Sequence, residues 1–567
     1  MTLNKRALLN IGILAFAAIL VAFVWYFPFL FKGYHSDVVN DQLVLARNIL
    51  SGDKYSLYND NGVLISSELV FSFGEESSTG NKLTAYLYSY LFKILGVLDI
   101  GGVLLFSIFL NALALFIFSI LVLYIFNLKT ALFFLAAYAF LPFNWRNVYA
   151  LGNYEFAILF LSAFFLLFFL GKDIQGKKIK FFALFISGVF ISLSALAKEA
   201  FLVLILILFL FLIFNKRKDL FIPVFAAVFI FFLLFYLPGF LRGDNIYKNV
   251  LFNSKPDKEL DFNLAGHLFP DYYTFRYDKN DFLEKYNLIL NGSEGYIKTL
   301  AIKKTAANVY GYKIDIFERI AVGFYIISGH LLRFVSFEET GGVFIFALMV
   351  LGFINLKAKE KFLFNFFGYW IILSVFLFSF VILVSRSHLM DFGFALALLL
   401  ALGAFYLADI IKNNFKLGGK QETALLSIFF AVLSYHLFIT DRIVWGKSYN
   451  ENMIKVYAFA NEIKDKNIQK NKVIMTGLRH DESLTLNFIT DKPFIVFRTE
   501  TLEKIINEKK LKNVLQEFNI RYALGYDLET LKRIKEEGNI EIISIDDLKH
   551  KTPATSFFKM WILGLFR

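Results

Sequence analysis

Apolar residues fill long, almost uninterrupted stretches of this chain, and polar residues gather in the segments between them. A helix needs about 20 apolar residues to cross the hydrocarbon core of a membrane. Eleven stretches approach that length, at residues 7–31, 100–126, 128–143, 155–171, 180–197, 199–215, 220–241, 341–356, 362–384, 390–411 and 422–440. The pattern therefore predicts an α-helical polytopic membrane protein with about 11 transmembrane helices.

The segments between these stretches predict the orientation of the chain. Lysine and arginine concentrate in five of them, at 127–129, 171–180, 215–219, 357–361 and 412–420. All five fall on one side of the membrane if the N-terminus is cytoplasmic, which is the positive-inside pattern. We therefore expect a multi-pass protein of the cell (plasma) membrane. Two further apolar segments, 83–98 and 316–336, carry tyrosines or charges and are expected to form interfacial helices on the outer face.

The composition supports a membrane protein and limits the kinds of partner that we expect. Apolar residues make up 57% of the 567 positions and charged residues only 19%, which excludes soluble and disordered proteins of this size. There is no cysteine, so disulfides and thiolate metal sites are excluded. The net charge of +12 would suggest nucleic acid in a soluble protein. Because the basic residues collect in the predicted cytoplasmic loops, we expect membrane lipids as partners and no nucleic acid.

In the predicted orientation two long loops, 32–82 and 242–315, lie outside the membrane and carry juxtamembrane helices. Both belong to a transmembrane domain that extends over residues 1–440. The composition then changes, because 40 of the 127 residues from 441 onward are charged, against 66 of the first 440. Short apolar runs alternate there with helical patterns such as 501–518 and 528–537; the runs lie at 473–477, 493–498, 522–526 and 540–545. This alternation predicts a small extracytoplasmic α/β domain at 441–567 with a mainly parallel sheet.

The first outer loop offers two carboxylates close to the predicted membrane boundary. Asp37 stands where the chain leaves the first span, and Asp41 follows four residues later. A partly desolvated carboxylate there can act as a general base toward an acceptor hydroxyl. The alternative is that Asp37 is only the N-cap of a juxtamembrane helix.

Two later segments place charges at the same face. Arg146 lies in an outer loop, and Glu155 opens an otherwise uncharged span, either facing a polar cavity or resting at the headgroup level. Lys198 and Glu199 interrupt the apolar residues 181–214 and form either a tight outer turn in water or a site for a phosphate.

Arg386 and His388 complete the set between the ninth and tenth spans. Both fall on the outer side, where the positive-inside rule disfavours cations. They therefore indicate either a site for an anionic lipid headgroup or snorkelling to ordinary phospholipids. Together, the candidates of all these segments map to one membrane face, which favours a cavity for an anionic, lipid-borne substrate.

This constellation resembles the polytopic glycosyltransferases of the GT-C fold, the group that contains protein O-mannosyltransferases and the aminoarabinose transferases of lipid A. In that family an acidic residue follows the first span and precedes a helix and a Gly-x-x-x-Tyr-like stretch, as Asp37 precedes 46–50 and 52–55. An arginine followed about nine residues later by an acid that opens a span resembles Arg146 and Glu155. Segments 197–199 and 386–391 resemble two further short family elements.

The resemblance implies transfer of a sugar from a polyprenyl-phosphate-type carrier to a glycan, lipid or protein acceptor outside the cytoplasm. Asp37 would deprotonate the acceptor hydroxyl, and Lys198 and Arg386 would hold the departing phosphate. Glu155 and Arg146 would orient the sugar or the acceptor.

Some enzymes of this family use a divalent metal and others do not. Asp37 and Asp41 could ligate Mg or Mn through oxygen, and no other cofactor is expected. The alternative functions are a transporter or flippase, or a ligase or polymerase, of lipid-linked saccharides. Transporters often contain duplicated halves and midplane ionisable residues, whereas here no duplication is seen and the ionisable residues gather at one face.

Overall fold

The computed structural model describes residues 5–32, 41–52, 82–96, 99–141, 144, 151–152, 154–198, 201–237, 315–336, 340–381, 392–416, 418–445, 449–466, 468–469, 472–478, 480–497 and 499–545. Each of the eleven predicted apolar stretches contains a helix. These helices are α1 (Lys5–Lys32), α4 (Ile100–Ile125), α5 (Leu128–Phe140), α7 (Glu155–Asp173), α8 (Lys177–Ala197), α9 (Leu202–Phe214), α10 (Lys218–Phe231), α19 (Val343–Lys359), α20 (Lys361–Phe376), α21 (Gly393–Phe415) and α22 (Gly419–Trp445).

Seven helices in the described part of the chain are long and apolar enough to cross a membrane. They are α1, α4, α7, α8, α21, α10 with the π-helical turn η3 (Phe232–Tyr236), and α20 with the π-helical turn η4 (Leu377–Val381). Helices α5 and α9 are apolar but shorter, with 13 residues each. The described part of the chain is therefore mostly helical with seven candidate spans, and the predicted number of about 11 stays a prediction.

Phenylalanine rings and glycine backbones fill the contacts between the bundle helices. The ring of Phe394 on α21 lies 4.5 Å from that of Phe118 on α4 and 5.3 Å from that of Phe165 on α7. Gly352 on α19 and Gly403 on α21 allow an even closer approach. A Cβ atom at either glycine would collide with a backbone carbonyl oxygen of the other helix, so these two helices pack backbone to backbone.

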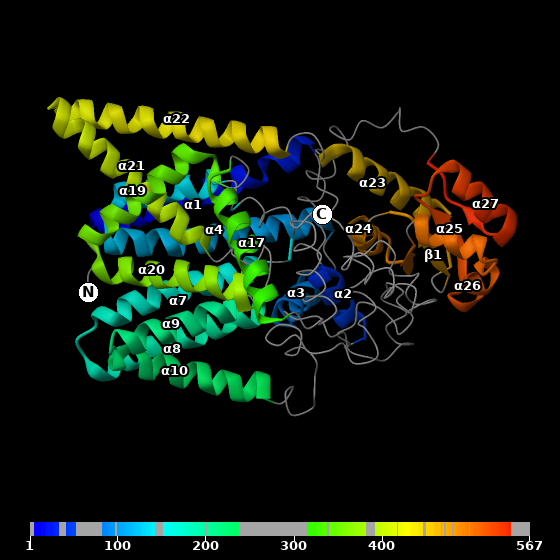
Figure 1. Cartoon of the computed structure of the whole chain (residues 1–567), viewed down its shortest axis with the longest axis horizontal. Helices are drawn as coiled ribbons and strands as arrows, with labels where there is room; N and C mark the ends of the chain where they lie inside the picture. Colours follow the sequence, from blue (N-terminus) through cyan, green and yellow to red (C-terminus); the bar gives the residue numbers. More distant parts are fainter. Residues whose placement is uncertain are drawn as a thin grey trace.

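The basic turns meet at one end of the bundle. Lys172, at the end of α7, pairs with Glu360 between α19 and α20 at 3.5 Å. Lys180 on α8 pairs with Asp219 at the start of α10 at 2.8 Å. In Figure 1 the N-terminus lies at this same end, and the small sheet lies beyond the opposite end.

Three further helices lie toward the sheet. Helix α2 (Asp41–Gly52) packs on α3 (Lys82–Leu95), and α17 (Ile316–Phe334) runs across the bundle (Figure 1). Arg319 of α17 donates from Nε to the carbonyl oxygen of Phe380 in η4 at 2.8 Å. The two segments expected to be interfacial are thus helical, and their depth in a bilayer stays a prediction.

The C-terminal part contains the predicted parallel sheet. Its strands are β1 (Val473–Thr476), β2 (Phe494–Val496), β3 (Ile520–Leu524) and β4 (Glu541–Ile542), in the order β2-β1-β3-β4 with every pair parallel. The helices before and between the strands are α23 (Tyr449–Asp465), α24 (His480–Thr490), α25 (Thr499–Asn507), α26 (Leu511–Glu517) and α27 (Leu528–Gly538). The segment 501–518, expected as one helix, forms two, because Lys509 between them adopts a left-handed backbone with φ 58°. The domain boundary at 440/441 stays a prediction.

Candidate functional site

The structure describes three of the predicted site residues. Glu155 and Lys198 are described with their side chains, and Asp41 is described as the first residue of α2. The other five predicted site residues lie outside the described residues; they are Asp37, Arg146, Glu199, Arg386 and His388.

Glu155 is the first residue of α7 and is buried, with only 2% of its surface exposed. Its Oε1 accepts hydrogen bonds from the backbone N–H of Gly152 at 2.9 Å and from the hydroxyl of Ser107 at 3.0 Å. Its Oε2 accepts from the backbone N–H of Tyr154 at 3.2 Å. The carboxyl group therefore fixes the turn that leads into its own helix.

Gly152 makes this turn possible. Its φ of +82° lies in the left-handed region, and a Cβ atom there would lie 2.9 Å from Cγ of Leu43 on α2. Leu43 stands two residues after Asp41, so the start of α2 rests directly on the turn that holds Glu155. The side chain of Asp41 itself is not among the described atoms.

A buried polar chain continues from Glu155 into the neighbouring helices. Ser107 belongs to α4, and its Oγ lies 3.4 Å from the hydroxyl of Tyr88 on α3. Both side chains are fully buried. Sequence reasoning gave Ser107 no role, and it interpreted the tyrosines of segment 83–98, which include Tyr88, only as a sign of an interfacial helix; neither residue type signals a buried hydrogen bond by itself.

Lys198 ends α8 and comes to the same place. Its Nζ lies over the ring of Tyr154, 4.6 Å from the ring centroid, and Tyr154 directly precedes Glu155. The hydroxyl of Thr84 on α3 donates to the carbonyl oxygen of Ala197 at 2.9 Å, which fixes the end of α8. Lys198 and Glu155 thus both contact Tyr154, the ammonium through the ring and the carboxyl through the backbone N–H. A cation–π contact of this kind is worth roughly 0.5–2 kcal/mol, and it fixes the ammonium of Lys198 beside the first turn of α7.

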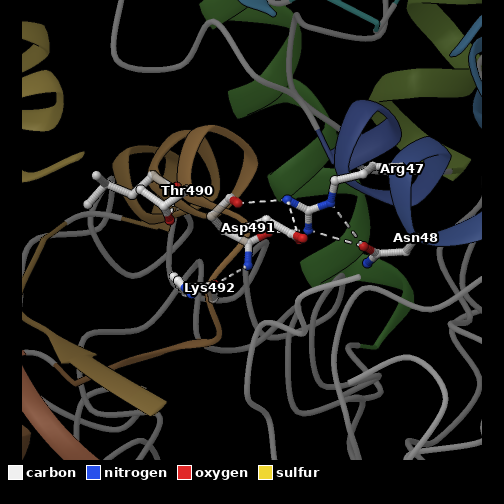
Figure 2. Close-up of polar contacts among 7 residues, drawn as sticks. Arg47, Asn48, Thr490, Asp491 and Lys492 are labelled. Carbon is white, nitrogen blue, oxygen red and sulfur yellow. Dashed lines mark hydrogen bonds and ion pairs between the residues drawn. The ribbon is translucent and has the colours of Figure 1, made fainter. Parts of the chain in front are cut away.

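A second polar cluster lies in the second half of α2. Arg47, only 3% exposed, donates from Nη1 to the carbonyl oxygen of Asn487 at 2.7 Å and from Nη2 to Oδ1 of the same residue at 2.9 Å. Nε and Nη2 reach Oδ1 of Asn48 at 3.3 and 3.1 Å, and Nη1 lies 3.3 Å from Oδ1 of Asp491. Figure 2 shows Arg47 reaching from α2 to the residues that end α24. Burial lowers the pKa of Arg47, and the carboxylate of Asp491 acts in the opposite direction.

Sequence reasoning gave Arg47 no role. The available signal was an arginine followed by an asparagine in the otherwise mostly apolar segment 43–50. A buried arginine needs acceptors, but the sequence does not say that they stand 440 residues later.

The predicted metal site is not tested by the described residues. They contain no group of three or more histidine, aspartate or glutamate side chains that could hold a metal ion. Asp37 and the side chain of Asp41, the predicted ligands, lie outside the described atoms. Mg or Mn therefore stays a prediction.

Comparison with known proteins identifies the fold. No protein family matches the sequence, and no curated protein matches it either. The crystal structure of the Archaeoglobus fulgidus oligosaccharyltransferase with Zn and sulfate is similar at a TM-score of 0.52 and 14% identity, over 89% of this chain and 67% of that one. The same enzyme tethered to an acceptor peptide gives a TM-score of 0.52 and 14% identity, over 91% and 68%.

A further structure is ArnT from Cupriavidus metallidurans bound to undecaprenyl phosphate, with 10% identity over 97% of this chain and 91% of that one, at a TM-score of 0.38. The argument for the fold comes from the oligosaccharyltransferase, whose match extends over most of the chain. The chain has the fold of the polytopic GT-C glycosyltransferases.

Proposed function

We propose that this protein is a membrane glycosyltransferase that moves a sugar from a polyprenyl-phosphate-type lipid carrier to an acceptor on the extracytoplasmic side. The observation that carries the proposal is the convergence of Glu155 and Lys198 on Tyr154, at the end of the bundle where α2 begins with Asp41. A fixed carboxyl beside a cation suits a substrate that combines a sugar with a phosphate. The acceptor is a glycan, a lipid or a protein.

The reaction assigns each residue a task. Asp37 takes the proton of the acceptor hydroxyl, and the acceptor oxygen forms a bond to the anomeric carbon of the sugar. The bond between that carbon and the phosphate oxygen breaks, and the carrier leaves as polyprenyl phosphate with the electron pair. Lys198 and Arg386 stabilise the negative charge that grows on the phosphate, while Glu155 and Arg146 orient the reacting sugar or acceptor.

Asp41, Glu199 and His388 contribute to substrate binding in the same proposal. The proposed membrane topology has eleven spans, a cytoplasmic N-terminus and an extracytoplasmic α/β domain. It is supported by the meeting of the basic turns at the end of the bundle that carries the N-terminus (Figure 1). The Glu155–Lys198 site lies at the opposite end of the bundle, so in the proposed orientation it faces the outer leaflet.

The test is transfer by the purified protein in liposomes, with a radiolabelled polyprenyl-phosphate sugar as donor and release of polyprenyl phosphate as the measured product. A flippase would move the labelled lipid between leaflets without breaking the sugar–phosphate bond. In the Asp37→Asn variant, transfer should fall by roughly 10²–10⁴-fold while donor binding persists. Asparagine caps a helix about as well as aspartate, so a capping role alone predicts nearly normal transfer.

Asp41→Asn is the matched control, one helical turn away from Asp37 in sequence. A smaller loss is expected there. Near-normal transfer by Asp37→Asn, or a complete loss in Asp41→Asn only, would show that Asp37 is not the base.

A further inference from the structure

The short helix α2 is held at two points along its length. Its first turn rests through Leu43 on Gly152, whose N–H donates to Glu155. Its last turns carry Arg47 and Asn48, which meet the end of α24 in the α/β domain. An α-helix rises 1.5 Å per residue, so Arg47 is about 9 Å along the helix from Asp41. A shift of α2 at Arg47 is therefore transmitted to the first turn of α2, which rests on Gly152.

The geometry around Arg47 matches a guanidinium and no other side chain. Every nitrogen of the group has an acceptor, and these acceptors come from α2 itself and from α24. Lysine has three donors on one atom and cannot span such a planar set. The carbonyl of Asn487 belongs to the last turn of α24, where a helix end favours a cation.

The acceptor side is also fixed in place. Nδ2 of Asn487 donates to the carbonyl oxygen of Lys492 at 2.7 Å, so its Oδ1 points toward Arg47. The N–H of Asp491 donates to the carbonyl oxygen of Asn487 at 2.9 Å, and Asp491 adopts a left-handed backbone with φ 50°. Arg47 thus binds a preformed helix end in the domain that carries the sheet (Figure 2).

An apolar contact lies beside this polar one. Phe92 on α3 and Phe488 on α24 have ring centroids 6.4 Å apart, and both rings are buried. The aromatic contact brings the α/β domain against the pair α2 and α3, but such contacts tolerate sliding. The bonds of Arg47 have fixed directions and therefore set the register.

We propose that Arg47 is a positioning residue for the transfer reaction. By docking α2 on the end of α24, it holds the first turn of α2 against the turn that carries Glu155, so this turn keeps its support from α2 only with the α/β domain docked. This inference rests on the proposed function and adds a role for the C-terminal domain.

The test compares kinetics with domain position in the full-length protein. The chain has no cysteine, so single cysteines at Tyr90 on α3 and Leu528 on α27, which are 64% and 87% exposed, can carry spin labels. Arg47→Ala should lower kcat by about 10- to 100-fold, since small misplacements of reacting groups have effects of that size. The donor KM should stay within twofold, and the distance distribution between the labels should broaden.

Arg533→Ala is the control, because Arg533 also donates to an asparagine, at 3.0 Å, but on the exposed surface within the same domain. It should leave kcat and the distances unchanged. Asp491→Asn is the second variant, since asparagine tolerates the left-handed backbone and the substitution removes the charge that pairs with Arg47; its kcat should fall by a smaller factor than in Arg47→Ala.

Wild-type kcat in Arg47→Ala overturns the proposal, and so does a lowered kcat with an unchanged distance distribution. If Arg47→Ala does not fold, wild-type kcat and distances in Asp491→Asn overturn it as well, because Arg47 is then a folding residue only. Absence of transfer by the wild type would instead refute the proposed function, and the distance measurement would still show whether Arg47 docks the domain.

Discussion

Replacing Glu155 by glutamine tests the site where the structure is most specific. The two side chains have nearly the same shape, but the amide carries a donor group in place of one acceptor oxygen. If the amide nitrogen takes the place of Oε2, it faces the N–H of Tyr154, and if it takes the place of Oε1, it faces the N–H of Gly152. In either orientation one buried backbone N–H loses its acceptor.

The size of the effect follows from that lost bond. A buried donor without a partner costs about 1–3 kcal/mol. If transfer requires the turn in its present form, this cost lowers kcat by roughly 5- to 160-fold, at 1.36 kcal/mol per factor of ten. Glu155→Ala should be more severe, because three donors lose their acceptor together.

The assay is transfer in liposomes with the folded fraction measured by size-exclusion chromatography in detergent. Ser107→Ala is the graded control, since it removes one donor to Oε1 and leaves both backbone bonds of Glu155 in place. It should reduce kcat by about fivefold, the equivalent of about 1 kcal/mol. A Glu155→Gln enzyme with wild-type kcat would show that the carboxyl only begins helix α7.

Three further outcomes are expected. Lys198→Ala should raise the donor KM by about 10- to 150-fold, the equivalent of a charge-assisted bond of about 1.5–3 kcal/mol, with normal membrane insertion; an unchanged KM would remove its role toward phosphate. Gly352→Ala should lower the thermal unfolding midpoint in detergent, because its Cβ meets a backbone carbonyl of α21 and overpacking costs about 1–3 kcal/mol. Gly12→Ala, with no atom within 4 Å of the added Cβ, should not lower it. A protease site inserted near residue 450 should be cleaved from outside intact cells, and protection there would contradict the proposed orientation.

Much of the fold follows from the sequence because its signals are local. A run of apolar residues long enough to cross a bilayer must satisfy its backbone internally and so becomes helical, and each such run contains a helix. The four strands follow for a similar reason, as short apolar runs between charged helices. The break at Lys509 was not predicted, because a lysine gives no indication of the left-handed backbone that it adopts.

Only the charged residues of the site could be predicted from the sequence. Glu155 and Lys198 stand out because charges within apolar segments are rare, and topology assigns both to one face. Tyr154 is next to Glu155 in the chain, but its role under Lys198 depends on how α7 and α8 pack. Ser107 depends likewise on the packing of α4 against α7.

The interface between the bundle and the α/β domain explains why polar residues such as Arg47 and Asn487 are buried there. Helix α24 is buried along most of its length, including Ser483, Thr485 and Asn487, which have no exposed surface. An apolar helix at this position could slide or rotate on α2 and α3, since apolar contacts have no preferred direction. A buried hydrogen-bonded group is stable in one arrangement only, because any other leaves it without a partner. The contacts of Arg47 with Asn487 therefore select one orientation of the domain over others of similar apolar area, and in the proposed enzyme that orientation is the one in which α2 stands against Glu155.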